Sequence, residues 1–248
     1  MQKHLRNEKG FALALILSVL PILIGAGLVA LFTMNYMQMN AHHLYICRTE
    51  SLKTQNQVGK NLETLLKLNP LSRELRIEKI AADVAVAAAI AAYGYGLPAA
   101  RAYEQSVKVR RVALDIEQRA LIIRSNALLL KTYFQTRSEL NAQISKDLGM
   151  LRPFITSTFS MRFSAPTYLA VRPDKTDLAP VYETQPQFEK RMTLVHRWQY
   201  RLSVADFLGK FLKGEQEFNR DCSVTLSEKD NKWQGKIRED KSLLKSVF

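Results

Sequence analysis

The chain has 248 residues, of which 36 are Lys or Arg and 23 are Asp or Glu, so its formal net charge is +13. A hydrophobic content of 47 % is ordinary for a folded protein, so the chain can bury a core and is not too polar to fold. The length allows one or two modest domains besides any anchor. The basic balance favours an acidic partner, anionic lipid or nucleic acid, and it equally suits a helical body kept soluble by Lys and Arg.

An apolar segment, KGFALALILSVLPILIGAGLVALF, opens the chain after a short basic leader over residues 1–10. Its uncharged part, residues 11–32, would form a helix of roughly 33 Å, about the thickness of one hydrocarbon core. This run is longer than the apolar region of a signal peptide, and only a weak cleavage site, Met39-Asn40-Ala41, follows it. The sequence therefore predicts a permanent single-pass transmembrane helix with a cytoplasmic N-terminus and the remaining chain outside.

Three residues interrupt this apolar segment. Pro21 removes one helical hydrogen bond and favours a kink, and Gly25 and Gly27 leave a surface that another helix can approach closely. Both features are also common in membrane helices in general. They favour packing against a neighbouring helix without demonstrating it.

The leader ending in Gly10, followed by Phe11 and the apolar run, resembles the class III signal of type IV pilin-like proteins. The early proline, the later glycines and the polar stretch Ser51–Gln57 are most similar to TadE/TadG-like minor pilins. The resemblance implies cleavage by a prepilin peptidase between Gly10 and Phe11, and helix packing through the residues that follow. Most pilins carry a glutamate where this chain has Leu15, which implies an accessory subunit and not a self-polymerising one.

Three helices are predicted after the apolar segment. The first covers residues 34–68 and ends before Asn69-Pro70, and the second begins at Ser72 and ends at the YGYG stretch. Residues 80–97 carry one charge, Asp83, so a second membrane span is an alternative to the close helix packing that we expect there. The third helix runs over residues 99–148.

The third helix combines an apolar stripe with several cations. We expect the stripe to pack in an antiparallel helical hairpin. The cations predict a basic surface for an acidic partner, with nucleic acid as an alternative that is not favoured because few aromatic residues accompany them. The residues of this predicted basic surface are Lys108, Arg110, Arg111, Arg119 and Arg124.

The residue composition changes near residue 151. β-Branched and aromatic runs with partial alternation predict a small antiparallel sheet over residues 151–248, with a hairpin turn at Asp230–Lys232. The stretch VADFLGKFLKGEQEF between two predicted strands reads as a short helix or a lid. The predicted fold class is therefore α+β with a pilin-like outline: leader 1–10, transmembrane helix 11–32, helical stem and hairpin 33–150, and β-rich domain 151–248.

Two cysteines are present, Cys47 on the first predicted helix after the anchor and Cys222 on a predicted strand. In an oxidising compartment they could pair, which would close a loop of about 175 residues and contribute roughly 5 kcal/mol in the chain-entropy model. Two unrelated free thiols are an equal alternative.

No motif for catalysis, metal or cofactor is present. His42 and His43 are adjacent and so face different sides of a helix, and the sequence has no HExxH, CxxC, phosphate-binding or GxSxG pattern. We expect no enzyme activity, no metal and no cofactor.

These observations predict a noncatalytic, membrane-anchored minor pilin-like subunit of a tight-adherence-type pilus or secretion apparatus in the bacterial inner membrane, with its body in the periplasm or outside the cell. Its partners would be the lipid bilayer, other pilin-like subunits and assembly proteins. One alternative is a bitopic envelope protein, unrelated to pilins, whose basic body binds an acidic partner. Another is a DNA-binding minor pilin.

Overall fold

The structure is a computed structural model that describes residues 2–151, 155–175, 177–204, 216–230 and 232–238. Within these ranges, the side chains of residues 2–15, 28, 29, 32, 148–151, 155–158, 200–204 and 216–218 are outside the description. The chain divides into two compact units, Met1–Tyr45 and Ile46–Phe248. The first helix, α1 (Gln2–Lys67), begins in the first unit and continues into the second.

The transmembrane helix expected over residues 11–32 needs correction. Among the described residues, no helix has the length and apolar content that crossing a membrane requires. The anchor at 11–32, the alternative second span at 80–97 and the inner-membrane location are therefore not supported.

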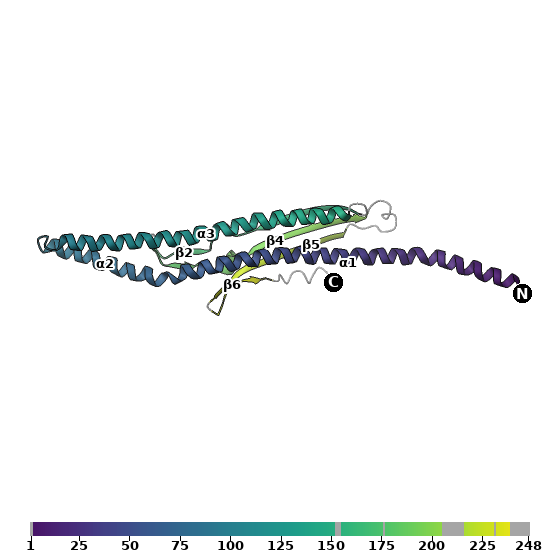
Figure 1. The fold of residues 1–248 in the computed structure, drawn as a ribbon, viewed down its shortest axis with the longest axis horizontal. Helices are drawn as coiled ribbons and strands as arrows, with labels where there is room; N and C mark the ends of the chain where they lie inside the picture. Colours follow the sequence, from purple (N-terminus) through teal and green to yellow (C-terminus); the bar gives the residue numbers. More distant parts are fainter. Residues whose placement is uncertain (1, 152–154, 176, 205–215, 231, 239–248) are drawn as a thin grey trace. The chain divides into compact units, whose positions relative to one another are not determined.

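The second unit contains a helical hairpin. Helix α2 (Asn69–Ala91) and helix α3 (Leu97–Leu151) run antiparallel beside each other (Figure 1). The break between α1 and α2 falls at Leu68, where proline was expected to end the helix. Helix α2 begins earlier than predicted, because Pro70 is tolerated in a first turn. Ser72 is therefore not a cap, and its hydroxyl donates to the carbonyl oxygen of Leu68.

The turn between α2 and α3 uses left-handed backbone. Tyr93, Gly94 and Gly96 have φ values of 58°, 85° and 79°. The N–H of Gly94 donates to the carbonyl oxygen of Ala89 at 2.9 Å and satisfies a carbonyl at the end of α2. Tyr93 occupies a position that usually favours glycine, and its side chain is exposed.

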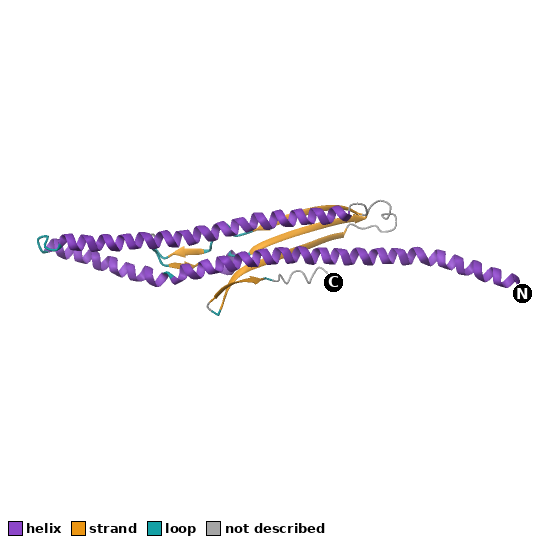
Figure 2. Ribbon diagram, in the orientation of Figure 1, coloured by secondary structure: helices purple, strands orange, loops and turns teal. Residues whose placement is uncertain are grey.

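The β-rich part contains two antiparallel sheets (Figure 2). The larger has the order β1-β4-β5-β6. Its strands are β1 (Ile155–Ser164), β4 (Leu194–Val204), β5 (Gln216–Lys229) and β6 (Lys232–Ile237). The smaller sheet pairs β2 (Val171–Pro173) with β3 (Tyr182–Thr184), and α4 (Phe188–Arg191) follows.

Two sequence predictions bear on this sheet. Strands β5 and β6 form a hairpin around Asp230, which has a φ of 52°. In β4, the alternation expected from the sequence places Leu194, His196 and Trp198 on the buried face. The expected short helix or lid falls largely on residues 205–215, outside the described residues, and residues 216–218 belong to β5.

The main core of the second unit lies where α1, α3 and the strands meet. Leu62 and Leu65 of α1 pack with Leu129 of α3, Met192 and Leu226 in one buried cluster. A smaller cluster joins Leu75 of α2, Leu114 of α3 and Ala179. Helices and an antiparallel sheet thus share a core, and the fold class is α+β.

Polar side chains are also buried along α3, at a seven-residue spacing. Thr132, Ser125 and Gln118 of α3 contact Thr54 and Asn61 of α1 and Ser72 of α2, respectively. From the first contact to the second, the spacing is seven residues on both α1 and α3. From the second to the third, it is seven residues on α3 but eleven from Asn61 to Ser72, because the break at Leu68 intervenes. Such buried hydrogen bonds favour one register between helices.

Candidate functional site

A disulfide joins Cys47 of α1 to Cys222 of β5. Their Cα atoms are 6.4 Å apart, and 175 positions separate them in the sequence. Both residues are buried. Of the two alternatives that the sequence left open, the structure has the pairing, which fastens the central part of the sheet to helix α1.

Helix α1 also covers the edge of the sheet at β6. The backbone N–H of Trp233 donates to Oε1 of Glu63 at 2.7 Å, and the N–H of Gly235 donates to Oδ1 of Asn56 at 2.8 Å. Unpaired N–H groups on an edge strand would otherwise be open to pairing with another chain. These side chains close that edge and hold β6 against the helix.

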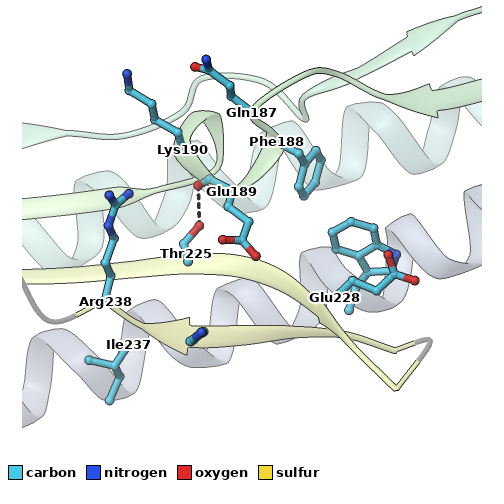
Figure 3. A pocket seen from close by; sticks show the side chains of 10 residues that line it. Gln187, Phe188, Glu189, Lys190, Thr225, Glu228, Ile237 and Arg238 are labelled. Carbon is cyan, nitrogen blue, oxygen red and sulfur yellow. Dashed lines mark hydrogen bonds between the residues drawn. The ribbon is translucent and has the colours of Figure 1, made fainter.

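A groove lies between α4 and the β5–β6 hairpin (Figure 3). Its volume is about 660 Å³, which falls in the range of small-molecule and peptide sites. The sequence did not single out its lining residues, because they come from three elements that meet only in the fold. They are Gln187, Phe188, Glu189, Lys190, Thr225, Glu228, Trp233, Lys236, Ile237 and Arg238.

The walls of the groove are held in place by specific contacts. The rings of Phe188 and Trp233 meet edge to face with centroids 4.8 Å apart. The carbonyl oxygen of Glu189 accepts hydrogen bonds from the hydroxyls of Thr225 and Thr193 (Figure 3 shows the first). The short helix α4 is thus tied to β5, and the groove has a preformed aromatic wall.

The groove carries more positive than negative charge. Lys190, Lys236 and Arg238 line it together with Glu189 and Glu228. None of these five side chains forms an ion pair with another described residue. A ligand that combines a carboxylate with an apolar or aromatic group would suit this lining.

The predicted basic surface on α3 is divided by internal ion pairs. Arg110 pairs with Glu78 of α2, and Arg119 pairs with Asp115 on its own helix. Lys108 and Arg124 are exposed, and neither pairs with any residue in the described part of the chain. Only part of the predicted surface is therefore free to attract an acidic partner.

Arg111 has a structural role instead. Its side chain is 5 % exposed and donates to Oδ2 of Asp177 at 2.6 Å and to the carbonyl oxygen of Leu178 at 2.8 Å. The hydrogen bond from Arg111 lowers the pKa of the Asp177 carboxyl. This ion pair could not be predicted from the sequence, because Asp177 lies in an irregular segment 66 positions further along the chain.

Apolar side chains of α1 are exposed to solvent in the first unit. Pro21 lies inside the helix, and a Cβ added at Gly25 or Gly27 would meet no atom within 4 Å. The predicted cleavage site at Gly10 and Phe11 and the packing position Leu15 lie among residues whose side-chain surroundings are outside the description. The large exposed apolar residues of this stretch are Ile16, Leu17, Val19, Leu20, Ile22, Leu23, Ile24 and Leu31.

Among the described residues, no three metal-ligating side chains come together in a cluster. No family model, no curated protein and no solved structure matches this chain. The resemblance to TadE/TadG-like minor pilins therefore rests on the N-terminal residues alone.

Proposed function

We propose that this chain is a noncatalytic structural subunit, a minor pilin-like accessory component of a tight-adherence-type pilus or secretion apparatus. Residues 16–31 of α1 pack against apolar helices of other pilin-like subunits. The body formed by residues 46–238 presents a binding surface that includes the groove beside α4. The membrane anchor expected from the sequence forms no part of this proposal.

The observation that carries the proposal is the exposed apolar surface of α1. Ile22 is 70 % exposed and Leu23 is 63 % exposed, and six further large apolar side chains of the same stretch are exposed with them. Each square ångström of apolar surface removed from water contributes about 25 cal/mol, so a partner helix would gain several kcal/mol from covering this stretch. Gly25 and Gly27 leave room for close approach.

The body supports a binding role over a catalytic one. The disulfide and the covered β6 edge make a fixed platform, and the groove offers aromatic and charged contacts. Its lining contains no histidine and no cysteine, and Thr225 donates its hydroxyl hydrogen bond to a backbone carbonyl. The hydroxyl proton is thus directed at a backbone carbonyl and not at a side-chain base that could activate the oxygen.

Photo-crosslinking in the native cell tests the proposed packing. A photoreactive residue in place of Leu23 is expected to give adducts with other pilin-like subunits. The matched control places the same residue at Tyr93, which is exposed in the α2–α3 turn. Absence of subunit adducts at Leu23, or equal adducts at Tyr93, would contradict packing through this stretch.

The N-terminus of the native protein tests the pilin relationship separately. Cleavage between Gly10 and Phe11 gives a mature chain that begins at Phe11, which intact mass measures directly. A chain that still begins at Met1 in cells with an active prepilin peptidase would contradict the relationship to pilins.

A further inference from the structure

Helix α3 carries a second apolar stripe that the fold does not bury. Val109, Ile116, Ile123 and Leu130 recur every seven residues and are 62 %, 62 %, 66 % and 41 % exposed. A smaller or aromatic apolar residue follows each of them by four positions and is also exposed. These second members are Ala113, Ala120, Ala127 and Phe134, and the eight residues together are called the outer stripe.

The outer stripe lies opposite the side of α3 that faces the core. The core side uses Val107, Leu114, Leu121 and Leu128, which also recur every seven residues and are buried or partly buried. A shift of two residues turns about 200° around a helix, so the two stripes lie on opposite sides. A helix that is apolar on both sides is normally buried on both sides.

The spacing of the outer stripe is that of a coiled-coil seam. Alternating steps of four and three residues from Val109 to Phe134 keep a 3.5-residue period over roughly 38 Å of helix. Alternation of large side chains with alanine lets the backbone of a partner helix approach closely. A scattered set of exposed apolar residues would not keep this period.

The charges beside the outer stripe identify the partner. Lys108, Arg124 and Lys131 are exposed and form no ion pair with any described residue. Two acidic residues also adjoin the stripe: Glu117 is exposed, and Asp115 is buried and paired with Arg119. Arg110 and Arg119 add positive charge, although each has an acidic neighbour on the body. A second copy of α3 would bring like charges together, whereas acidic flanks would be complementary.

We propose that the outer stripe is a docking surface for an amphipathic helix of a partner protein, with an apolar heptad seam flanked by Glu and Asp. The apolar residues of the partner fill the spaces over Ala113, Ala120 and Ala127, and its carboxylates face Lys108, Arg124 and Lys131. This surface is separate from residues 16–31 of α1, so the inference does not depend on the proposed pilin relationship.

Peptide binding to the full chain tests the proposal. The probe is a synthetic helical peptide of about four heptads with Leu and Ala in its seam and Glu at its flanking positions. A second peptide has Lys at the same flanking positions. The Glu peptide is expected to bind at least about tenfold more tightly, and its affinity is expected to fall as salt rises.

Matched variants assign the binding to α3. Ile123→Asp places a charge in the seam and is expected to lower the affinity for the Glu peptide more than about tenfold. Ile77→Asp alters an equally exposed isoleucine of α2 (69 % against 66 %) and is expected to leave binding unchanged. The double variant Arg124→Glu/Lys131→Glu is expected to shift the preference toward the Lys peptide. Circular dichroism checks that each variant is folded.

Three results would overturn the proposal. The first is no binding of the Glu peptide to the folded chain. The second is equal binding of both peptides, or equal loss in the two isoleucine variants. The third is a dimer, detected by sedimentation of the full chain, that Ile123→Asp dissociates, because a second copy would then be the occupant.

Discussion

The backbone of Gly59 in α1 lies directly against the carbonyl oxygen of Trp233 in β6. A Cβ added at Gly59 would come closer to that oxygen than the 3.0 Å that real Cβ atoms keep, and it would also lie 3.1 Å from Cδ1 of Leu226. The absence of a side chain therefore lets the helix and the edge strand meet at backbone distance.

Gly59→Ala should destabilise the body by about 1–3 kcal/mol, because helix and strand must separate to admit the methyl group. Gly25→Ala is the matched control: it is also a helical glycine, and nothing lies within 4 Å of its added Cβ. Urea unfolding, followed by tryptophan fluorescence, measures the difference. Equal stability of the two variants would show that the sheet does not press on α1 at Gly59.

Removal of the disulfide should destabilise the body strongly. Cys47 and Cys222 close a loop of 175 positions, and the loss of such a cross-link costs roughly 5 kcal/mol in the chain-entropy model. Cys47→Ser/Cys222→Ser is expected to lower the urea midpoint, and reductant should have the same direction of effect on the natural chain. The disulfide is first verified in the natural chain by comparing its mobility on non-reducing and reducing gels after thiol blocking. Two blocked thiols in protein from intact cells would contradict the pairing.

The sequence predicted the elements that depend on local pattern. Asn69-Pro70 marked the break between two helices, and the apolar stripe predicted on the third helix included Val107 and Leu114, which are buried. Alternation in β4 marked its buried face. In each case, one element contains its own signal.

The candidate site could not be predicted in the same way. The groove forms only when Phe188 of α4 contacts Trp233 of β6, two residues that lie far apart in the sequence. The ion pair of Arg111 likewise depends on Asp177, which lies in an irregular segment. A list of cations does not show which of them are neutralised inside the fold. The apolar run at residues 11–32 was interpreted as a membrane anchor because length and composition alone do not identify what covers an exposed helix.

Gln118 should be important for the packing of the helical hairpin. Its Nε2 atom donates to Oγ of Ser72 at 2.9 Å and to the carbonyl oxygen of Pro180 at 3.0 Å, in a fully buried position. Gln118→Leu removes both hydrogen bonds and leaves the carbonyl oxygen of Pro180 buried without this partner, which costs about 1–3 kcal/mol. Gln105→Leu, at an exposed position of α3, should change stability little. Thermal unfolding of both variants separates the two cases, and equal melting temperatures would contradict the role of Gln118.

His196 should make the stability of the body depend on pH. It lies opposite Cys222 in the sheet, its ring meets that of Phe163 at 5.0 Å, and neither ring nitrogen has a hydrogen-bond partner among the described residues. Burial lowers the pKa of His196 from 6.5 to about 4. The folded chain thus keeps this ring neutral at a pH where the unfolded chain protonates it.

The sign of the effect follows from proton binding. Between pH 6.5 and about 4, the unfolded state holds more protons at His196, so stability falls as the pH is lowered through this window. The difference in pKa corresponds to about 3 kcal/mol, fully present above the window and lost below it. His196→Leu should remove this part of the pH dependence, whereas His42→Gln, at an exposed position, should keep it. Urea unfolding across the window measures both, and an unchanged slope in His196→Leu would show that another group titrates.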